Sequence, residues 1–338
     1  MQSQGGALIG LDWGTSSLRA YLLDSQGNVL QAHQRPWGVM QLPSGKNLAA
    51  AANEMPGDQR KRDFQHALND TCGAWLSANS ALPILACGMV GSAQGWQEAS
   101  YLEVPISLSS LALSLTRVEQ NNGYSIYIVP GLIQRSALPN VMRGEETQVL
   151  GVLSQPYLAS PAPLMIGLPG THSKWVTASA EGIAKFDTFM TGEVFTALRQ
   201  LTILGKTMLA LPEGQAHDDA AFIRGLDVAK SEDGALGVLS NIFSTRTLGL
   251  TGQLHATVQA DYLSGVLIGH EMAALSRRSQ PRPASVILCG EPDLCRRYAL
   301  GLEHYDFAKS VIAEHATVRG LWQIALAAGL VQCAVANF

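Results

Sequence analysis

Asp12 stands where an apolar run ends and a turn of small residues begins, namely Gly14, Thr15 and Ser16. Backbone N–H groups and hydroxyls in such a turn can surround an anion. A carboxylate beside bound phosphate can position Mg²⁺, because this ion is usually held by one or two carboxylates together with nucleotide phosphates and water. The alternative is that Asp12 only hydrogen-bonds its own turn, as Asp commonly does. The spacing therefore predicts either a metal-assisted phosphate site or a plain hairpin turn.

A second stretch repeats this pattern and favours the phosphate site. The apolar run at residues 164–168 leads into Gly170, Thr171, His172 and Ser173, and a returning strand follows. Two such hairpins, one in each half of the chain, could face one another across a cleft and hold the phosphates of one nucleotide from both sides. We therefore assign the turn residues of both hairpins to phosphate binding.

Glu145 and Glu146 begin a predicted helix between the two hairpins. Acids in the first turn of a helix interact favourably with its dipole, which would explain one of them. Phosphoryl transfer also needs a group that takes the proton of the attacking hydroxyl. Neighbouring side chains on a helix point roughly 100° apart, so the two acids cannot face one site equally. We predict Glu145 as the base and Glu146 in a supporting or salt-bridged position.

Ser92, Gln94 and Trp96 lie in a glycine-rich loop after the strand predicted at residues 83–89. Ligands of open α/β sheets bind at the carboxyl ends of strands, so we predict substrate contacts here. The alternative for Trp96 is a place in the core.

Gly290 ends a second such strand, predicted at residues 285–290, and Glu291 opens the helix that follows. A strand, a glycine turn and a helix N-terminus form a shelf of bare backbone on which an adenosine can lie. We therefore assign Gly290 and Glu291 to adenosine binding.

The apolar spacing predicts the framework that must hold these residues. We expect two meanders of three strands, at residues 7–35 and 164–187. We expect further single strands at residues 83–89, 125–129, 285–290 and 309–312. We expect helices at residues 63–78, 145–151, 192–201, 218–228, 234–243, 256–276, 294–302 and 315–333. Residues 130–143 read as a loop. We place an N-terminal domain at 1–143 and a C-terminal domain at 144–338, with the last helix able to pack back onto the first domain.

Composition limits the class of protein. The 338 residues are enough for two domains, and the net charge of −4 with only 15% charged residues provides no basic face for nucleic acid or an anionic membrane. Five cysteines without a CxxC pair fit free thiols in a reducing cytoplasm. Polar residues interrupt the apolar segment 320–338, which indicates a buried helix and not a membrane span. We expect a cytoplasmic protein.

The whole chain resembles the 2-dehydro-3-deoxygalactonokinase family of the actin-like ATPase superfamily. Five stretches in both halves carry the resemblance, at residues 9–19, 142–148, 168–176, 186–195 and 320–325. The resemblance implies an α/β fold of two ribonuclease-H-like domains with ATP and Mg²⁺ in the cleft between them. It also implies transfer of the γ-phosphate to the C6 hydroxyl of a sugar acid, 2-dehydro-3-deoxy-D-galactonate, in D-galactonate breakdown.

The resemblance extends to individual site residues. The Gly-Glu-Glu motif at residues 144–146 lies where kinases similar to glycerol kinase carry their base aspartate, which implies a base at Glu145 or Glu146 without choosing between them. The motif at residues 186–195 implies that Thr188 and Thr191 contact the sugar acid.

The carboxylate of such a substrate needs a cationic partner. Arg143, beside the predicted base, could bind it with the two-pronged geometry of a guanidinium. The alternative is that Arg143 pairs with Glu146 on the helix surface.

Two rival functions use the same phosphate-binding hairpins. A non-catalytic actin-like regulator would not need the acids at Glu145 and Glu146, so these residues argue against it. A phosphate-chain hydrolase would use the same Glu to activate water, and the family match after Lys174 argues against that class.

Overall fold

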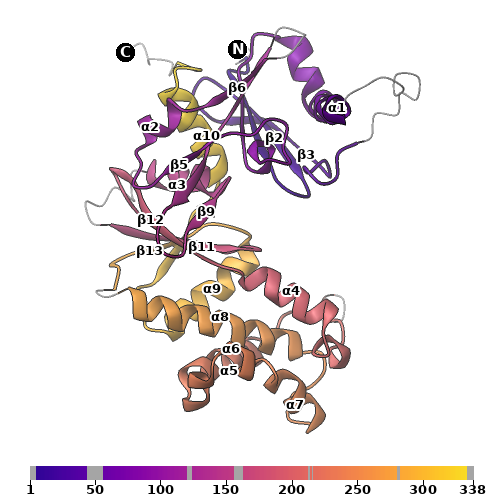
Figure 1. The fold of residues 1–338 in the computed structure, drawn as a ribbon, viewed down its shortest axis with the longest axis vertical. Helices are drawn as coiled ribbons and strands as arrows, with labels where there is room; N and C mark the ends of the chain where they lie inside the picture. Colours follow the sequence, from indigo (N-terminus) through magenta and orange to yellow (C-terminus); the bar gives the residue numbers. More distant parts are fainter. Residues whose placement is uncertain are drawn as a thin grey trace. The chain divides into compact units, whose positions relative to one another are not determined.

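The computed structural model describes residues 5–43, 56–119, 124–155, 163–211, 214, 216–279 and 282–332. The chain divides into two compact units, the first comprising Met1–Pro161, Ala178–Lys185 and His315–Phe338, and the second Ala162–Thr177 and Phe186–Glu314. The first unit therefore extends beyond residue 143, where we expected the boundary. It keeps α3 (Glu145–Leu153), and the last helix, α10 (Ala316–Ala327), returns to it (Figure 1).

A six-stranded sheet with the order β3-β2-β1-β4-β7-β6 forms the centre of the first unit. The predicted meander is present as the antiparallel strands β1 (Leu8–Trp13), β2 (Leu18–Leu23) and β3 (Val29–Arg35). The remaining strands are β4 (Ile84–Cys87), β6 (Thr116–Glu119) and β7 (Ser125–Ile128). Since β1 and β4 run parallel, with Asp12 opposite Cys87, their carboxyl ends meet at the same edge of the sheet.

The core of the first unit packs on this sheet. Helix α1 (Pro56–Ala78) buries Phe64 against it, at the helical spacing that the sequence shows. The rings of Trp13 and Trp96 lie 5.2 Å and 5.5 Å, respectively, from the Phe64 ring. Trp96 is 6% exposed and belongs to this core, so the core alternative describes it better than a substrate contact.

A second, small sheet in the first unit was missed by the sequence analysis. It has the order β5-β8-β9 and consists of β5 (Tyr101–Glu103), β8 (Gly131–Gln134) and β9 (Asn140–Met142). The prediction of a loop over residues 130–143 was therefore wrong. Strands this short show too little alternation to be recognised. Two other short helices of this unit are η1 (Met89–Gly91) and α2 (Leu108–Ala112).

The sheet of the second half repeats the first plan, with the order β12-β11-β10-β13-β14. Its strands are β10 (Leu164–Leu168), β11 (Ser173–Ser179), β12 (Gly182–Phe189), β13 (Val286–Leu288) and β14 (Ser310–Ile312). Strands β10, β13 and β14 are parallel. A meander followed by parallel strands is the ribonuclease-H-like strand order, and its presence in both sheets confirms the predicted fold class.

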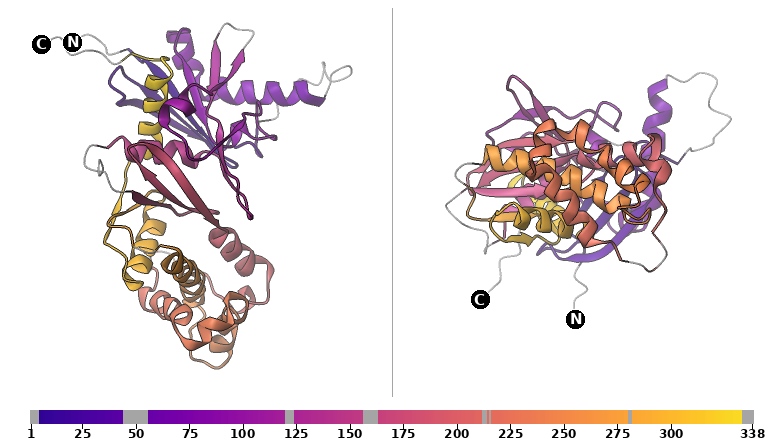
Figure 2. Two further views of the ribbon diagram at one scale, coloured as in Figure 1. Left: turned by 60° about the vertical axis from the view of Figure 1, so that its left-hand side comes forward. Right: turned by 90° about the horizontal axis from the view of Figure 1, so that it is seen from below.

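Helices make up the rest of the second unit. They are α4 (Thr191–Leu201), η3 (Gly205–Thr207), α5 (Asp219–Lys230), η4 (Glu232–Leu236), α6 (Val238–Asn241), α7 (Ser244–Leu250), α8 (Gln259–Arg278) and α9 (Pro292–His304). The helix predicted at 234–243 is divided between η4 and α6, and α7 was not predicted. Helix α5 lies along α8 (Figures 1 and 2), where glycines permit a close approach.

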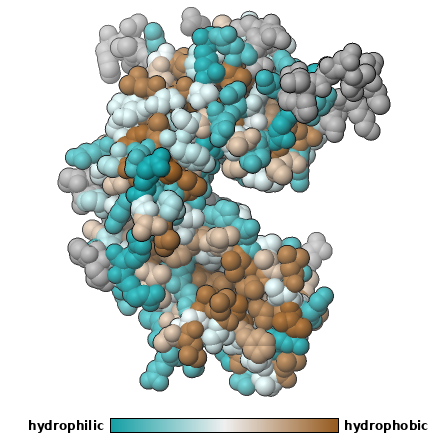
Figure 3. All heavy atoms as spheres, viewed as in Figure 1, coloured by the Kyte–Doolittle hydropathy of each residue, from teal (hydrophilic) through white to brown (hydrophobic). Residues whose placement is uncertain are grey.

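The surface of these helices is rich in apolar side chains. Figure 3 shows hydrophobic residues gathered over the helical part of the second unit, and the most exposed of them include Leu201, Leu236 and Leu239. In the described residues, no helix combines the length and the hydrophobicity needed to cross a membrane. Four cysteines, at positions 72, 87, 289 and 295, are free and buried, and Cys333 lies outside the described residues.

Candidate active site

A cavity of about 210 Å³ opens in the first unit where β1 and β4 end and α3 begins. Its lining, which we call the first-unit cavity, consists of Asp12, Gly14, Thr15, Gly88, Met89, Arg143, Gly144, Glu145, Gln148 and Thr317. Five of these residues were predicted from the sequence, from two segments more than 120 positions apart: Asp12, Gly14, Thr15, Arg143 and Glu145. The structure thus brings the predicted metal carboxylate, part of the first phosphate turn and the predicted base into one cavity.

Two glycines allow these segments to meet. Gly144, the residue before α3, has φ of 110°, and Gly88, after β4, has φ of 94°, both in the region that favours glycine. A Cβ atom on Gly144 would lie 3.1 Å from the Cα atom of Gly88, and a Cβ atom on Gly88 would lie 2.8 Å from the carbonyl oxygen of Trp13. Because of this contact, α3 starts directly beside the strand end that carries Asp12.

Asp12 is partly buried and forms an ion pair with Arg19, whose Nη1 lies 3.4 Å from its Oδ2. Burial raises the pKa of Asp12, and the positive charge of Arg19 opposes that rise. No cluster of three His, Cys, Asp or Glu side chains suited to a metal ion is found within the described ranges. A single carboxylate suits Mg²⁺ held largely by phosphate oxygens and water, and it does not suit an ion that needs an all-protein site.

The first phosphate turn is held by backbone hydrogen bonds. Its ends are joined by the bond from Gly14 N to Ser17 O, 2.9 Å long. The carbonyl oxygens of Gly14 and Thr15 accept bonds from the N–H groups of Val39 and Met40, both 3.0 Å long. The carbonyls that would repel an anion are therefore occupied, while Thr15 is exposed. Ser16 is also exposed but is not part of the cavity lining.

The two adjacent acids of α3 point in different directions, as predicted. Glu145 lines the first-unit cavity, and its Oε2 accepts a bond from Arg143 N at 3.0 Å. Glu146 is fully buried; its Oε2 accepts from Gly144 N at 2.7 Å and its Oε1 from Thr147 Oγ1 at 3.1 Å. Burial, with a smaller contribution from the charge of Glu145, raises the pKa of Glu146 to about 7. Only Glu145 is therefore placed to meet a ligand in this cavity.

The stability of the protein should depend on pH through Glu146. Since burial raises its pKa from 4.5 to about 7, the stability that the protonated group contributes is fully present below pH 4.5 and is lost as the pH rises to 7. The difference in unfolding free energy between Glu146→Gln and the native protein should therefore change with pH. It should shift in favour of the variant by about 3 kcal/mol as the pH rises from 4.5 to 7. Urea denaturation at a series of pH values measures the difference. A difference that does not change with pH would contradict the buried, protonated state.

Helix α10 supports α3 through close contacts at glycines. A Cβ atom on Gly151 of α3 would lie 1.8 Å from the carbonyl oxygen of Ala316, and one on Gly320 of α10 would lie 1.8 Å from that of Thr147. Thr317 of α10 accepts a long bond from Gln148 Nε2 at 3.4 Å, and both residues line the first-unit cavity. The position of Glu145 thus depends on the last helix of the chain.

Replacing Gly320 by alanine should force α3 and α10 apart. We expect a loss of about 1–3 kcal/mol in unfolding free energy, as for other overpacked cores, measured by chemical denaturation. Gly73→Ala in α1 is the matched control, because a Cβ atom there meets no atom within 4 Å. That control should be neutral or slightly stabilising. Equal stability of the two variants would refute the proposed contact.

Arg143 is buried and paired differently from either expectation. Its guanidinium carbon lies 4.3 Å from the centroid of the Tyr101 ring, and Nη2 donates to Ala99 O at 2.8 Å. No ion pair with Glu146 is found among the described residues. Within the same part of the chain, its Nε and Nη1 have no hydrogen-bond partner. A buried unpaired donor costs about 1–3 kcal/mol, so an anionic ligand that reached this guanidinium would be bound favourably.

The other residues predicted from the glycine-rich loop lie outside this lining. Ser92 is 7% exposed, and its hydroxyl donates to Met89 O at 2.7 Å. Gln94 is exposed, and its backbone carbonyl accepts a bond from Arg60. The Ser92 hydroxyl therefore serves the structure of the loop, and Gln94 is joined to α1 through its backbone.

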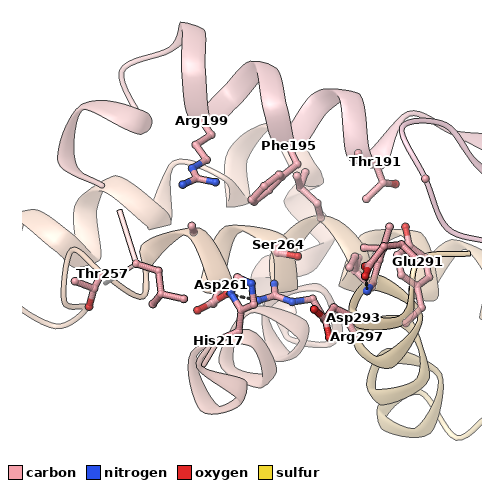
Figure 4. Close-up of a pocket in the computed structure, with 18 of the residues that line it drawn as sticks. Thr191, Phe195, Arg199, His217, Thr257, Asp261, Ser264, Glu291, Asp293 and Arg297 are labelled. Carbon is pink, nitrogen blue, oxygen red and sulfur yellow. Dashed lines mark hydrogen bonds and ion pairs between the residues drawn. The ribbon is translucent and has the colours of Figure 1, made fainter. Parts of the chain in front are cut away.

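A second cavity, of about 330 Å³, lies within the second unit (Figure 4). We call it the second-unit cavity; it lies between α4, α8 and the start of α9, and its lining includes Gly170, Thr191, Gly192, Phe195, Arg199, His217, Thr257, Asp261, Ser264, Ile268, Glu291, Asp293, Leu294, Arg297 and Tyr298. It brings together the predicted residues Gly170, Thr191 and Glu291. Thr171, His172, Ser173, Thr188 and Gly290 are not part of this lining.

The predicted adenosine shelf has the expected backbone. Glu291 is the N-cap of α9, and its Oε2 accepts a bond from Leu294 N at 2.9 Å, with Pro292 as the next residue. Gly290 is exposed, and a Cβ atom there would lie 3.1 Å from the carbonyl oxygen of Pro169. Glu291 therefore borders the cavity while its carboxylate caps the helix.

The second phosphate turn exposes only part of its side chains. Thr171 and His172 are exposed, and His172 Nε2 lies 2.5 Å from Glu193 Oε2. Ser173 is 1% exposed, and its hydroxyl lies 2.7 Å from that of Tyr298. The Ser173 side chain thus faces the interior, and a phosphate role for it is confined to its backbone.

Thr188 does not stand free for a substrate either. Its hydroxyl accepts a bond of 3.1 Å from the Nζ of Lys174, a buried residue.

Several polar residues of the second unit escaped the sequence analysis. Asp261 is buried and accepts bonds from His217 Nδ1 at 2.8 Å, Asp218 N at 2.9 Å and Arg297 Nη2. Glu271 is another buried acid, in the same helix. In the sequence, both are acids within the predicted helix 256–276, and an acid in a helix is ordinarily expected on its solvent-exposed face. Only the tertiary packing shows that these two side chains are buried.

Comparison with known proteins shows the family to which the chain belongs. The family described as 2-keto-3-deoxy-galactonokinase matches residues 12–324. The chain is 36% identical over 322 residues to the probable 2-dehydro-3-deoxygalactonokinase of Rhizobium meliloti (strain 1021), covering 94% of this chain and 95% of that protein. It is 34% identical over 291 residues to the 2-dehydro-3-deoxygalactonokinase of Escherichia coli (strain K12), covering 86% and 87%.

A solved structure extends the similarity to the fold. A crystal structure from Sinorhizobium meliloti that carries the same kinase name has a TM-score of 0.77 and 32% sequence identity, and the match covers 95% of this chain and 98% of that one. The family match over nearly the full chain, the two relatives and this structure all agree. The chain belongs to the 2-keto-3-deoxy-galactonokinase family and is a sugar-acid kinase.

Proposed function

We propose that the protein transfers the γ-phosphate of ATP to the C6 hydroxyl of 2-dehydro-3-deoxy-D-galactonate in the breakdown of D-galactonate. The observation that carries the proposal is the first-unit cavity, in which Asp12, the first phosphate turn and Glu145 line one space. The names of the relatives support the choice of substrate. No residue in this cavity favours either rival function.

Glu145 is proposed as the base that takes the proton of the C6 hydroxyl. It lines the cavity, and its Oε2 is oriented by the N–H group of Arg143. Glu146 lies beneath it as a buried group that holds the N–H of Gly144 at the start of the helix. Because the Glu145 side chain is already held by a backbone N–H group at the start of its own helix, it loses little entropy when the substrate hydroxyl binds.

Asp12 is proposed to hold Mg²⁺, directly or through water, and so to neutralise charge on the phosphates. Gly14, Thr15 and Ser16 would bind phosphate oxygens through backbone and hydroxyl donors, as would Gly170, Thr171 and His172 together with the Ser173 backbone. The second-unit cavity, bordered by Glu291, would hold the nucleoside. Supplying charge and position is most of what phosphoryl transfer asks of a protein.

Arg143 is proposed to bind the carboxylate of the sugar acid. Its Nε and Nη1 have no hydrogen-bond partner within the described chain, and each can donate a charge-assisted bond to a carboxylate oxygen.

A coupled ATP assay over a panel of 2-keto-3-deoxy sugar acids tests the proposed function. The D-galactonate derivative should be phosphorylated with the highest kcat/KM, and NMR of the product should place the phosphate on C6. The gluco epimer and a sugar acid that lacks the C6 hydroxyl serve as controls. Higher kcat/KM for another acid, or phosphate on another carbon, would replace the proposed substrate or position.

A further inference from the structure

Glu271 is a buried acid that accepts hydrogen bonds from three elements of the second unit. It is 2% exposed in α8. Its Oε1 accepts from Trp175 Nε1 of β11 at 2.6 Å, and its Oε2 accepts from Tyr298 Oη of α9 at 2.8 Å and from Thr191 Oγ1 at the start of α4. Burying a carboxylate is costly even when it is hydrogen-bonded, and burial raises the pKa of Glu271 to about 7.

Two of the three donors lead to the second phosphate turn. The hydroxyl of Tyr298 lies 2.7 Å from that of Ser173, at the end of the turn. Thr191 precedes Gly192, where a Cβ atom would lie 2.4 Å from the carbonyl oxygen of Gly170. The next residue of α4, Glu193, donates its N–H to Thr171 O at 2.9 Å. The turn is therefore held by α4 and α9, and both helices are joined to Glu271.

Above about pH 7, where Glu271 is ionised, its carboxylate also fixes the direction of each hydrogen bond. A carboxylate only accepts, and a hydroxyl has one proton to donate. Tyr298 and Thr191 both donate to Glu271, so Ser173 must donate to Tyr298. Thr191 Oγ1 is then left with lone pairs alone, at the wall of the second-unit cavity (Figure 4). It can accept from a ligand hydroxyl, and it cannot donate to a phosphate or a carboxylate.

We propose that Glu271 is a positioning residue for ATP, which holds the second phosphate turn in place and keeps Thr191 Oγ1 as an acceptor for a ribose hydroxyl. The proposal rests on the proposed function, in which this turn and the second-unit cavity bind the nucleotide. It replaces the expectation that Thr191 contacts the sugar acid. Hydrogen-bond donors and acceptors bind a ligand most effectively when the protein holds them in position before the ligand binds.

Glu271→Gln is the first test, because glutamine has nearly the same shape and its amide can donate to Tyr298 and Thr191, which reverses both bonds. The Kd for ATP, measured by calorimetry in MgCl₂ at pH 8, where Glu271 is ionised, should rise about tenfold or more, as expected for the loss of a charge-assisted bond. KM for ATP should rise in parallel, while kcat at saturating ATP and KM for the sugar acid stay within about threefold. The melting temperature should not fall, since a buried charge is removed.

Variants of the hydrogen-bonded partners keep the test decisive if Glu271→Gln fails to fold. Tyr298→Phe removes the link to Ser173 and should weaken ATP binding in the same direction. Thr191→Val should abolish the preference for ATP over its 2′-deoxy and 3′-deoxy forms, and Thr191→Ser should restore it. Thr196→Val is the matched control on α4, because Thr196 is exposed and its hydroxyl, among the residues that the structure describes, bonds only Gly192 O of its own helix.

Unchanged ATP affinity in folded Glu271→Gln and Tyr298→Phe would overturn the proposal. So would a parallel loss of kcat, both KM values and melting temperature, since that pattern marks a purely structural role. A native protein that binds ATP but phosphorylates no sugar acid would contradict the proposed function and leave the affinity comparison valid. A native protein that binds no ATP would overturn both.

Discussion

Asp12→Asn should lower kcat with Mg-ATP on the order of 10³-fold while the protein stays folded, because a metal ion supplies several kcal/mol of transition-state charge stabilisation. The structure places this carboxylate at the end of β1, in the wall of the first-unit cavity and paired with Arg19. Asparagine keeps the size of the side chain and loses the charge. Coupled assays over a range of MgCl₂ concentrations would measure the loss and show whether excess metal restores part of it.

Asp24 offers a matched control from the same meander. It is 2% exposed, and its carboxylate accepts bonds from the N–H groups of Gln26 and Asn28 in the turn after β2. Asp24→Asn should therefore lower the stability and leave kcat unchanged, the reverse of the result expected at Asp12. Near-native kcat in Asp12→Asn would remove the metal assignment.

Glu145→Gln should lower kcat by ~10² to 10⁴, which is the usual loss when a general base is removed. KM for ATP should change little, since Glu145 belongs to the first-unit cavity and the nucleoside is assigned to the second-unit cavity. Coupled ATP assays at saturating concentrations of both substrates would measure the loss.

Glu146→Gln is the comparison that decides between the two acids. Glu146 is fully buried and bonded to Gly144 N and Thr147 Oγ1, so its replacement should cost less activity than that of Glu145. If Glu146→Gln shows the larger loss of kcat, the two roles are exchanged, and α3 must turn to bring the buried acid to the substrate.

The sequence was most informative where function and local structure coincide. The repeated pattern of an apolar strand followed by small turn residues predicted both hairpins, and it predicted the end of β1 as the position of Asp12. The angle between neighbouring helix positions predicted that Glu145 and Glu146 would diverge. These are local properties, set by the periods of strand and helix.

What escaped prediction depends on contacts between distant segments. The unit boundary differs from residues 143 and 144 because α3 packs on α10 through Gly151 and Gly320. The local sequence around α3 does not predict contact with a helix so distant in the sequence. Arg143 stacks on Tyr101 of a small sheet that was not predicted. The role proposed for Glu271 depends on Trp175, Tyr298 and Thr191, which lie in other elements.

The return of α10 to the first unit has a consequence for the order in which the protein matures. Helix α3 requires the close glycine contacts with α10, yet α10 follows α3 in the sequence at a long distance and is translated well after it. Until α10 is made, the helix that carries Glu145 lacks its support, although the strand with Asp12 precedes both helices in the sequence. We therefore expect a nascent chain or a fragment that ends before α10 to lack the support of Glu145 and to consume no ATP.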